Sequence, residues 1–493
     1  MNWDRETDVV VIGYGSAGAM AAVAAHDAGA RVLILEKMAE AGGATRTSGG
    51  RMRVILDPEK AIEFFFEMCE RTTPRDILEV LVREGVKIPE MVRNLGGEAE
   101  SVLPEKKFYP HPTERFPLPG SESIAFNRYR VKGPVATAAD TGGGANVMSL
   151  LIRNVTARKI EALYETPAVK LITGDQGGVI GVEASCRENR MKIKARRGVI
   201  LASGGFGANR EMLKNYVGQS YYQYYCNPGN TGDGIKMAME IGADLWHMSA
   251  IVASFAYVIP ECEYPIRHRM SSPGYLYVDQ RGRRFMNEMG TDSHWMWTQV
   301  SQWNSETMSY LRAPCFVIYD DDTFRGGSVG STSIGKAGDI YQWSDDNEAE
   351  LEKGWIIQAD DIDVLANKLN IIPNVLQETI SRYNHYCVGG YDPEYHRKLQ
   401  TLVPIVRPPF YAGKILPTLY NTLGGPRRDR QARVLHVGGS PIPRLYSAGE
   451  LGSLWDRNYI GAGNVLECMV FGKIAGKNAA AEVPWDAATK THE

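Results

Sequence analysis

Residues 8–18 read DVVVIGYGSAG, and this stretch decides the fold. The apolar, β-branched run of residues 8–12 predicts a buried strand, and the alanine-rich segment after the glycines predicts an amphipathic helix. Gly13 permits the tight turn between them, Gly15 lets the backbone approach a pyrophosphate, and Gly18 lets the helix pack closely on the strand. The stretch therefore predicts the strand, turn and helix of a dinucleotide-binding site.

A second apolar segment, ARVLILEK (30–37), contains an acidic residue at its end. Glu36 lies 21 residues beyond Gly15, where a carboxylate binds the hydroxyl groups of the adenosine ribose. The chain continues from there as EKMAEAGGATRTSGG (36–50), a second run of small residues and hydroxyl groups that suits an extended dinucleotide. This second run favours FAD over NAD.

Further glycine-rich motifs follow along the chain. They are GVILASGGFGANREML (198–213), NTGDGIKMAMEIGA (230–243), YVDQRGRRFMNE (277–288), YNTLGG (420–425) and LYSAGELGS (445–453). Their order resembles that of the FAD-binding flavoproteins that include fumarate reductases, succinate dehydrogenases and 3-ketosteroid dehydrogenases, whereas turns of an unrelated α/β protein would not share that order. The resemblance implies an α/β fold in which a Rossmann-like FAD-binding domain (1–245 and 415–493) is interrupted by an α+β cap domain (246–414).

The resemblance also implies which residues bind FAD. Ala168 and Val169 are expected near the adenine, and Glu450 near the ribityl chain. The full expected set is Gly13, Gly15, Ser16, Ala17, Gly18, Glu36, Lys37, Gly42, Gly43, Ala44, Thr45, Ser48, Gly49, Gly50, Ala168, Val169, Ala202, Ser203, Gly204, Asp233, Gly449, Glu450, Gly463, Asn464 and Val465. Some family members attach FAD through a histidine, and residues 40–50 contain none, so we expect the flavin to be held non-covalently.

The substrate anchors of the fumarate reductases are absent from this sequence. Those enzymes hold a dicarboxylate with a histidine before a TxGG motif and an arginine in an NRLGGN segment, where this chain has Asn421 and Tyr459. A phenol cannot form the two parallel hydrogen bonds that a guanidinium makes to a carboxylate. Arg457, two residues earlier, remains a candidate for binding a small acid.

The segment YIGAG (459–463) instead resembles the end of 3-ketosteroid dehydrogenases, where a tyrosine hydroxyl and a glycine amide bind the substrate oxygen. Tyr459 and Gly463 would then be two neutral donors to that oxygen, each stabilising its developing charge by about 3–4 kcal/mol. The alternative is that Tyr459 is a core tyrosine beside the flavin. Tyr109, in the aromatic segment 108–116, is a further candidate for substrate contact.

The family places its proton carrier five residues beyond the asparagine of the RFxNE motif. Counting from Asn287 gives Asp292, and a carboxyl group shielded from water has a raised pKa that suits proton transfer near neutrality. A shift of two residues would give this role to His294. An aspartate at a helix start can also be only an N-cap.

Aromatic residues gather at 220–229 and 294–303, where they suit either a flat polycyclic substrate or core packing. We therefore expect hydride transfer between flavin N5 and a carbon of a hydrophobic polycyclic substrate, as in the soluble reductases of plant polyphenols that convert isoflavones to equol. The alternatives are a 3-ketosteroid dehydrogenase or reductase, a fumarate-like enoate reductase, and a flavin-dependent binding protein without turnover.

The composition argues against several other function classes. A net charge of −3 provides no overall attraction to nucleic acid or to a membrane, and seven scattered cysteines form no haem, iron–sulfur or disulfide motif. Electrons are therefore expected from NAD(P)H or from a separate donor. With no export signal and no long apolar run, the sequence predicts a cytoplasmic protein, and it leaves the oligomeric state open.

Overall fold

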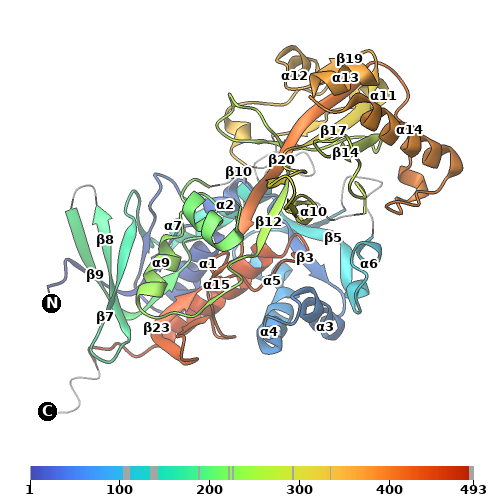
Figure 1. Ribbon diagram of the computed structural model, residues 1–493. Coiled ribbons are helices and arrows are strands. Elements are labelled where there is room, and N and C mark those ends of the chain that lie inside the picture. Colours follow the sequence, from blue (N-terminus) through green and yellow to red (C-terminus); the bar gives the residue numbers. More distant parts are fainter. Residues whose placement is uncertain are drawn as a thin grey trace.

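The computed structural model describes residues 2–103, 111–133, 143–186, 189–219, 223–224, 227–290, 292, 294–332 and 335–487. Figure 1 shows two bodies joined by the long strand β20 (Phe410–Thr422). The larger body contains segments from both halves of the chain, and the smaller body lies at the upper right. Tyr109 lies outside the described residues.

The larger body is built on an eight-stranded sheet with a parallel centre. Its main path runs β22 (Arg433–Leu435), β23 (Pro441–Ser447), β9 (Asn189–Leu201), β1 (Arg5–Ile12), β2 (Val32–Leu35) and β6 (Glu161–Leu163). β1 pairs in parallel with β2 and with residues 193–201 of β9, and the last three residues of β9 also pair in parallel with β23. The first half of β9 pairs antiparallel with β8 (Val179–Cys186), and β8 pairs with β7 (Ala168–Thr173).

The central strand β1 has a sequence that suits burial on both faces. Val9, Val10 and Val11 are fully buried, and such β-branched side chains pack well in a covered parallel sheet. β1 ends directly before Gly13, and β2 ends directly before Glu36. Because the carboxyl ends of parallel strands meet at one edge, the glycine turn and the acidic residue lie together.

The helix after the glycine turn is α1 (Ser16–Asp27), and it differs from its prediction. It was expected to be amphipathic, but every residue from Ser16 to Ala25 is buried. The prediction is wrong because α1 is covered by the sheet and by two helices, α15 (Asn464–Ala481) and α7 (Gly143–Ala157). A helix covered on several sides is apolar all round.

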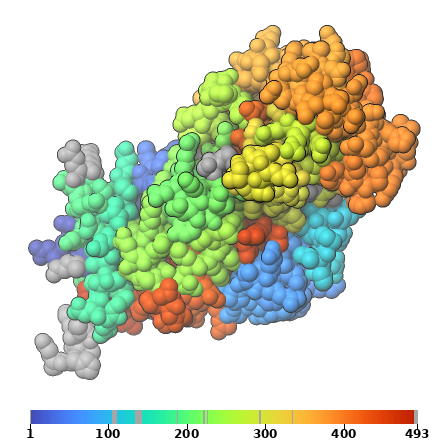
Figure 2. All heavy atoms as spheres, viewed as in Figure 1, coloured from blue at the N-terminus to red at the C-terminus, as the bar shows by residue number. Residues whose placement is uncertain are grey.

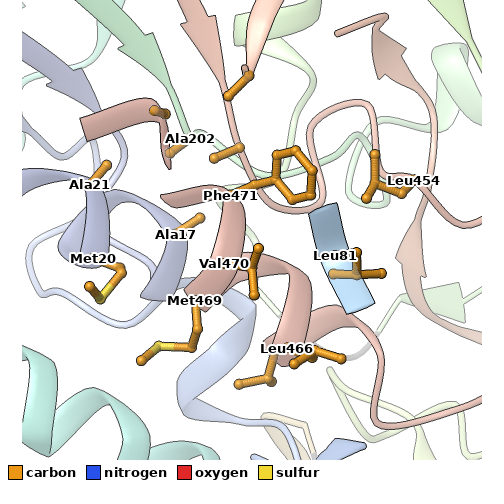
Figure 3. Packing of buried hydrophobic residues seen from close by; sticks show 14 of the residues in the cluster. Ala17, Met20, Ala21, Leu81, Ala202, Leu454, Leu466, Met469, Val470 and Phe471 are labelled. Carbon is orange, nitrogen blue, oxygen red and sulfur yellow. The ribbon is translucent and has the colours of Figure 1, made fainter. Parts of the chain in front are cut away.

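Helices α1 and α15 approach each other through small residues. Figure 3 shows Ala17 of α1 close to Val470 of α15. A Cβ atom added to Gly472 would lie only 2.6 Å from the Ala17 carbonyl oxygen. The carboxyl-terminal helix therefore packs on the amino-terminal nucleotide motif, and this brings residues from both ends of the chain to one site.

A three-stranded antiparallel sheet lies in the same body, in the order β3 (Met52–Ile55), β5 (Ile124–Val131) and β4 (Ala99–Val102). Its register places Arg53 of β3 opposite Arg128 of β5. The short helices of this part of the chain are α2 (Gly43–Arg46), α3 (Pro58–Met68), α4 (Arg75–Gly85), α5 (Ile88–Asn94) and α6 (Pro112–Arg115).

The smaller body, which we call the cap, contains most of a second eight-stranded sheet. Its strands are β20, β10 (Gln223–Tyr224), β12 (Ile251–Tyr257), β13 (Ile266–His268), β14 (Tyr275–Val278), β17 (Cys315–Asp320), β18 (Gly330–Ser331) and β19 (Ile357–Ala359). The predicted boundary between 414 and 415 falls inside β20, which pairs with β12 at its end and with β17 at its beginning. The division into 1–245 with 415–493 and 246–414 stays a prediction.

The helices of the cap surround this sheet on its outer side (Figure 1). They are α11 (Asp321–Arg325), α12 (Glu348–Glu352), α13 (Ile362–Lys368) and α14 (Pro373–Gly389). α14 begins at Pro373, a position at the start of a helix where the missing amide hydrogen of proline is not needed. In the space-filling view, the cap covers the upper right of the molecule above the blue and cyan surface of the amino-terminal segments (Figure 2).

The remaining elements are short. They are α8 (Arg210–Met212), α9 (Asp233–Glu240), α10 (Met296–Val300), β11 (Leu245–Trp246), β15 (Trp303–Asn304), β16 (Ser309–Tyr310) and β21 (Gly425–Pro426). Within the ranges that the structure describes, none of the helices combines the length and the apolar character needed to cross a membrane.

A buried ion cluster fixes the RRFMNE motif within the cap. Arg284 donates to both carboxylate oxygens of Glu288, at 2.9 and 2.8 Å, and to Asp392 at 2.8 Å. Arg397 also donates to Glu288, at 3.1 Å. The four side chains are at most 1% exposed, so their charges have to be paired. This cluster anchors the segment that continues to Asp292.

Candidate active site

A cavity lies at the carboxyl ends of β1 and β2. The predicted FAD residues that line it are Gly13, Gly15, Ser16, Ala17, Glu36, Lys37, Gly43, Ala44, Thr45, Ala168, Ala202, Ser203, Gly204, Asp233 and Glu450. The predicted residues outside its lining are Gly18, Gly42, Ser48, Gly49, Gly50, Val169, Gly449, Gly463, Asn464 and Val465. The sequence did not single out Asn227 and Asn230, which also line it.

The lining of this cavity suits a dinucleotide. A Cβ atom on Gly15 would come no closer than 3.9 Å to the rest of the chain, so the absence of a side chain there leaves room above the turn. Gly13, by contrast, has φ +103° and packs against the backbone of Ala202. The Ser203 hydroxyl group is buried and has no hydrogen-bond partner among the described residues, and a bound phosphate or ribose would give it one.

Glu36 lies buried at one end of the cavity. Its carboxylate accepts hydrogen bonds from the backbone amides of Tyr14, at 2.7 Å, and Met38, at 2.8 Å. Burial nevertheless raises the pKa of Glu36. Next to it, the Lys37 ammonium donates to Asp233 at 2.7 Å. These contacts hold a carboxylate where the adenosine ribose is expected.

Glu450 is the second acidic residue of the cavity. It accepts hydrogen bonds from the Thr422 amide, at 3.2 Å, and from the Asn230 side chain, at 3.1 Å. Burial raises the pKa of Glu450 to about 8. This carboxyl group therefore holds a proton near neutrality and can donate a hydrogen bond as well as accept one.

Tyr459 lies buried directly before α15, and its hydroxyl oxygen accepts two hydrogen bonds. They come from the amides of Gly463, at 3.0 Å, and Asn464, at 3.1 Å. The sequence predicted that the Gly463 amide donates to a substrate, but in the structure it donates to Tyr459. With both lone pairs used, the hydroxyl group keeps its hydrogen for another acceptor. Burial raises the pKa of Tyr459 to about 12, so it stays protonated.

Asp292 is fully buried and forms an ion pair with Arg115. It also accepts hydrogen bonds from Nδ1 of His294, at 2.6 Å, and from the His294 amide, at 2.9 Å. Burial alone would raise its pKa, but Arg115 and His294 hold the pKa of Asp292 well below its usual range. The raised pKa expected from the sequence is therefore wrong, and a proton-carrying role does not fit the ionised carboxylate.

His294 is the better placed of the two proton-carrier candidates. Its side chain is 24% exposed, and its ring centre lies 5.3 Å from that of Tyr459 and 5.6 Å from that of Tyr420. Because Nδ1 donates to Asp292, Nε2 is the nitrogen left to exchange a proton. The pair repeats the arrangement in which a carboxylate orients a histidine that acts as acid or base.

Aromatic rings adjoin this group of side chains. The Trp295 indole donates to the Tyr459 carbonyl at 2.9 Å, and the Trp295 ring centre lies 5.5 Å from that of Phe116. Trp455, fully buried, lies 5.9 Å from the Tyr459 ring. Trp303 from the predicted aromatic segment is 51% exposed and is not part of this wall.

The two positions that replace fumarate-reductase anchors have different surroundings. Asn421 is buried and accepts a hydrogen bond from the Asn464 side chain at 3.1 Å. Arg457 is exposed, and its guanidinium lies 3.5 Å from the Ser249 hydroxyl group. This arginine therefore lies on the surface.

The comparison with protein families gives the assignment. Residues 8–466 match the model of the family described as FAD binding domain. The chain belongs to this family. Its relatives include proteins named as reductases and as a dehydrogenase, so the predictions of FAD and of an FAD-dependent oxidoreductase family are confirmed. Non-covalent attachment stays a prediction.

Individual relatives are distant. The chain is 28% identical to the NADH:fumarate oxidoreductase of Klebsiella pneumoniae over 97% of its own length, but it spans only 48% of that relative. It is 27% identical to the digoxin reductase of Eggerthella lenta, over 99% of this chain and 89% of that one. Among solved structures, the 3-ketosteroid Δ1-dehydrogenase of Sterolibacterium denitrificans superposes with a TM-score of 0.82 at 21% identity, covering 97% of this chain and 100% of that one. The predicted fold class is confirmed.

Proposed function

We propose that the protein is a reductase of hydrophobic polycyclic compounds that carry a carbonyl or phenol oxygen. The observation that carries the proposal is the Tyr459 hydroxyl group at the start of α15, which has a hydrogen to donate and lies beside aromatic rings and the Asp292–His294 pair. FAD, when bound, supplies the hydride. NAD(P)H or a separate protein is the proposed electron source, and the cytoplasm the proposed location.

Tyr459 binds the substrate oxygen in this proposal. Its own oxygen is fixed by two amides at the positive end of an 18-residue helix, so the hydroxyl group becomes a stronger donor. Negative charge develops on the substrate oxygen when a conjugated carbon accepts hydride. A fixed neutral donor stabilises that charge without reorganising.

His294 supplies the proton. Asp292, held ionised by Arg115, accepts from Nδ1 and so fixes the ring and its tautomer. Nε2 then exchanges the proton with the substrate. Asp292 is a positioning residue in this scheme, and the ion pair with Arg115 keeps the Asp292 carboxylate negatively charged.

The substrate class that we favour is an isoflavan with a phenol para to a benzylic hydroxyl group, as in tetrahydrodaidzein. His294 protonates the benzylic hydroxyl, the carbon–oxygen bond breaks, and water leaves. The phenol releases its proton to solvent, which leaves a quinone methide whose oxygen accepts a hydrogen bond from Tyr459. Hydride addition at the benzylic carbon and uptake of a proton from solvent by the oxygen restore the phenol and give the deoxygenated product.

Two other candidates have support of their own. A 3-ketosteroid dehydrogenase or reductase is favoured by the likeness of YIGAG and by the TM-score of 0.82. A fumarate-like enoate reductase is favoured by the relative named NADH:fumarate oxidoreductase. The exposed position of Arg457 argues against a carboxylate clamp at this end of the site.

The deciding experiment is anaerobic photoreduction of the purified flavoprotein, followed by separate addition of isoflavans, 3-ketosteroids, enones, cinnamates and fumarate. We expect a hydroxylated isoflavan to restore the absorbance of oxidised flavin fastest. Reoxidation by steroids or by fumarate alone would assign the protein to that class instead. If no compound restores the absorbance, the proposal of a reductase is wrong for this panel and a binding role gains support.

A further inference from the structure

A single arginine holds the loop between Tyr459 and α15. The backbone amide of Arg53 donates to the Ala462 carbonyl at 3.0 Å. Its Nε donates to the Gly461 carbonyl at 2.9 Å, and its Nη2 donates to the Ile460 carbonyl. One residue of β3 therefore satisfies three consecutive carbonyl groups of a loop that is more than 400 positions later in the chain.

This loop has a conformation that needs such support. Gly461 and Ala462 have φ angles of +68° and +56°, and the left-handed region costs an alanine roughly 1–2 kcal/mol. The Arg53 side chain is fully buried, so the carbonyl groups that it serves are shielded from water. Buried carbonyl groups without a donor are destabilising.

The loop in turn sets the position of the Tyr459 hydroxyl group. Residues 460–462 are followed directly by Gly463 and Asn464, whose amides donate to the Tyr459 hydroxyl group. A displaced loop would move these amides away from the hydroxyl oxygen. The positive charge of Arg53 also acts on the Tyr459 hydroxyl group. Burial raises the pKa of Tyr459, and the charge of Arg53 lowers it.

We propose that Arg53 is a positioning residue for the reaction, which acts by holding residues 460–462 and thereby aiming the Tyr459 hydroxyl group at the substrate oxygen. The inference rests on the role of Tyr459 in the proposed function. It explains why a charged side chain occupies a fully buried position in a short strand.

A suitable control exists on the neighbouring strand. Arg128 lies opposite Arg53 in the sheet register and is also buried, at 7% exposure. Its guanidinium donates to the carbonyl groups of Ala125 and Asn127, both at 3.1 Å. R128K therefore alters a comparable buried guanidinium whose hydrogen bonds to Ala125 and Asn127 lie within β5.

The test is a double-mutant cycle with R53K and Y459F, and a parallel cycle with R128K and Y459F, in the FAD-loaded full chain. The measured quantity is the rate at which a substrate from the panel reoxidises the photoreduced flavin. R53K keeps the charge and part of the donor set, and we expect it to lower this rate by about 10²-fold, the size of effect that a small misplacement produces. In the Y459F background the same change should cost less than about 3-fold, because the two residues act through one group.

R128K should change the rate by the same factor in both backgrounds. An equal loss for R53K in both backgrounds would overturn the inference and leave Arg53 a stabilising residue only. If R53K folds poorly, R53Q with its thermal midpoint and FAD content measured provides the second arm of the cycle. A Y459F variant with the parental rate would refute the role of Tyr459 itself, which separates failure of the proposed function from failure of the inference about Arg53.

Discussion

At the scale of single residues, Tyr459 is the most direct test of the site. Replacement by phenylalanine keeps the ring and its contacts with Trp455 and His294, but it removes the hydrogen that the hydroxyl group donates. We expect flavin reoxidation to slow by about 10²–10³-fold, with FAD content near that of the parent. Stability should fall by about 1–3 kcal/mol, because the amides of Gly463 and Asn464 lose their acceptor. A core tyrosine would give the same loss of stability with unchanged chemistry.

Asp292 and His294 make a second prediction at this scale. His294→Ala removes the proton carrier, and we expect the substrate-dependent half-reaction to fall by about 10²–10⁴-fold. Asp292→Asn should also slow it, because an amide holds the Nδ1 hydrogen less firmly than a carboxylate. Reduction of the flavin by the electron donor should be unaffected in both variants, as stopped-flow absorbance would check. A parental rate in His294→Ala would leave the proton carrier unassigned among these residues.

The same pair predicts a pH dependence. The pKa of Asp292 is lower in the folded state than in the unfolded chain, where an aspartate titrates near about 3.9. Its contribution to stability is therefore complete above the unfolded pKa and is lost as the pH falls through the folded pKa. The thermal midpoint of the parent should exceed that of Asp292→Asn at neutral pH, and the difference should shrink below about pH 4. A difference that does not change with pH would contradict the ionised, paired carboxylate.

These residues also indicate what the sequence can predict about a site. Motif spacing located Asp292, His294 and Tyr459, because each lies at a fixed offset from a recognisable glycine or arginine motif. It could not predict that Asp292 is ionised, since the cause is Arg115, which reaches it from a distant segment. Arg53 was missed for the same reason, because its partners are carbonyl groups and carry no residue type.

At the scale of elements, the contact between α1 and α15 decides whether the two ends of the chain form one cavity. The β1–α1–β2 unit could be predicted from its own residues because its pattern is local. The burial of α1 on several sides could not, because it depends on helices that come much later in the chain. Gly472 is one of the positions where the two helices come close together, as a Cβ atom there would lie 2.6 Å from the Ala17 carbonyl oxygen and 3.1 Å from Met20 Cβ.

We therefore expect Gly472→Ala to destabilise the protein by about 1–3 kcal/mol through overpacking, although alanine is the better helix former. FAD should be retained less well, since Ala17 lines the cavity. Gly389→Ala is the matched control, because Gly389 is at the exposed end of α14 and its added Cβ would meet nothing within 4 Å. The measurements are the thermal midpoint and the flavin-to-protein absorbance ratio. Equal midpoints for the two variants would show that the helices can move apart without cost.

At the scale of the whole molecule, the cavity draws its lining from positions between Ile12 and Cys468. The larger body therefore encloses its ligand with segments that are contiguous only after folding. A ligand that binds the folded chain alone stabilises it by an amount that grows with its free concentration. FAD should therefore stabilise the fold of the larger body in addition to taking part in the reaction.

If FAD is held non-covalently, this coupling can be measured. Acid precipitation should release all of the flavin into the supernatant. The thermal midpoint of the protein stripped of flavin should rise as FAD is added back. At a free FAD concentration of 100 Kd, the free energy of unfolding should be higher by about 2.7 kcal/mol. Glu36→Ala should shift this titration to higher FAD concentrations, because loss of a hydrogen bond to a charged group costs about 1.5–3 kcal/mol. The control is Glu161→Ala, at a half-exposed carboxylate of β6 that pairs with Arg5 outside the cavity lining, which should leave the titration unchanged. Flavin that remains in the acid pellet would mean a covalent bond, and the midpoint would then not depend on added FAD.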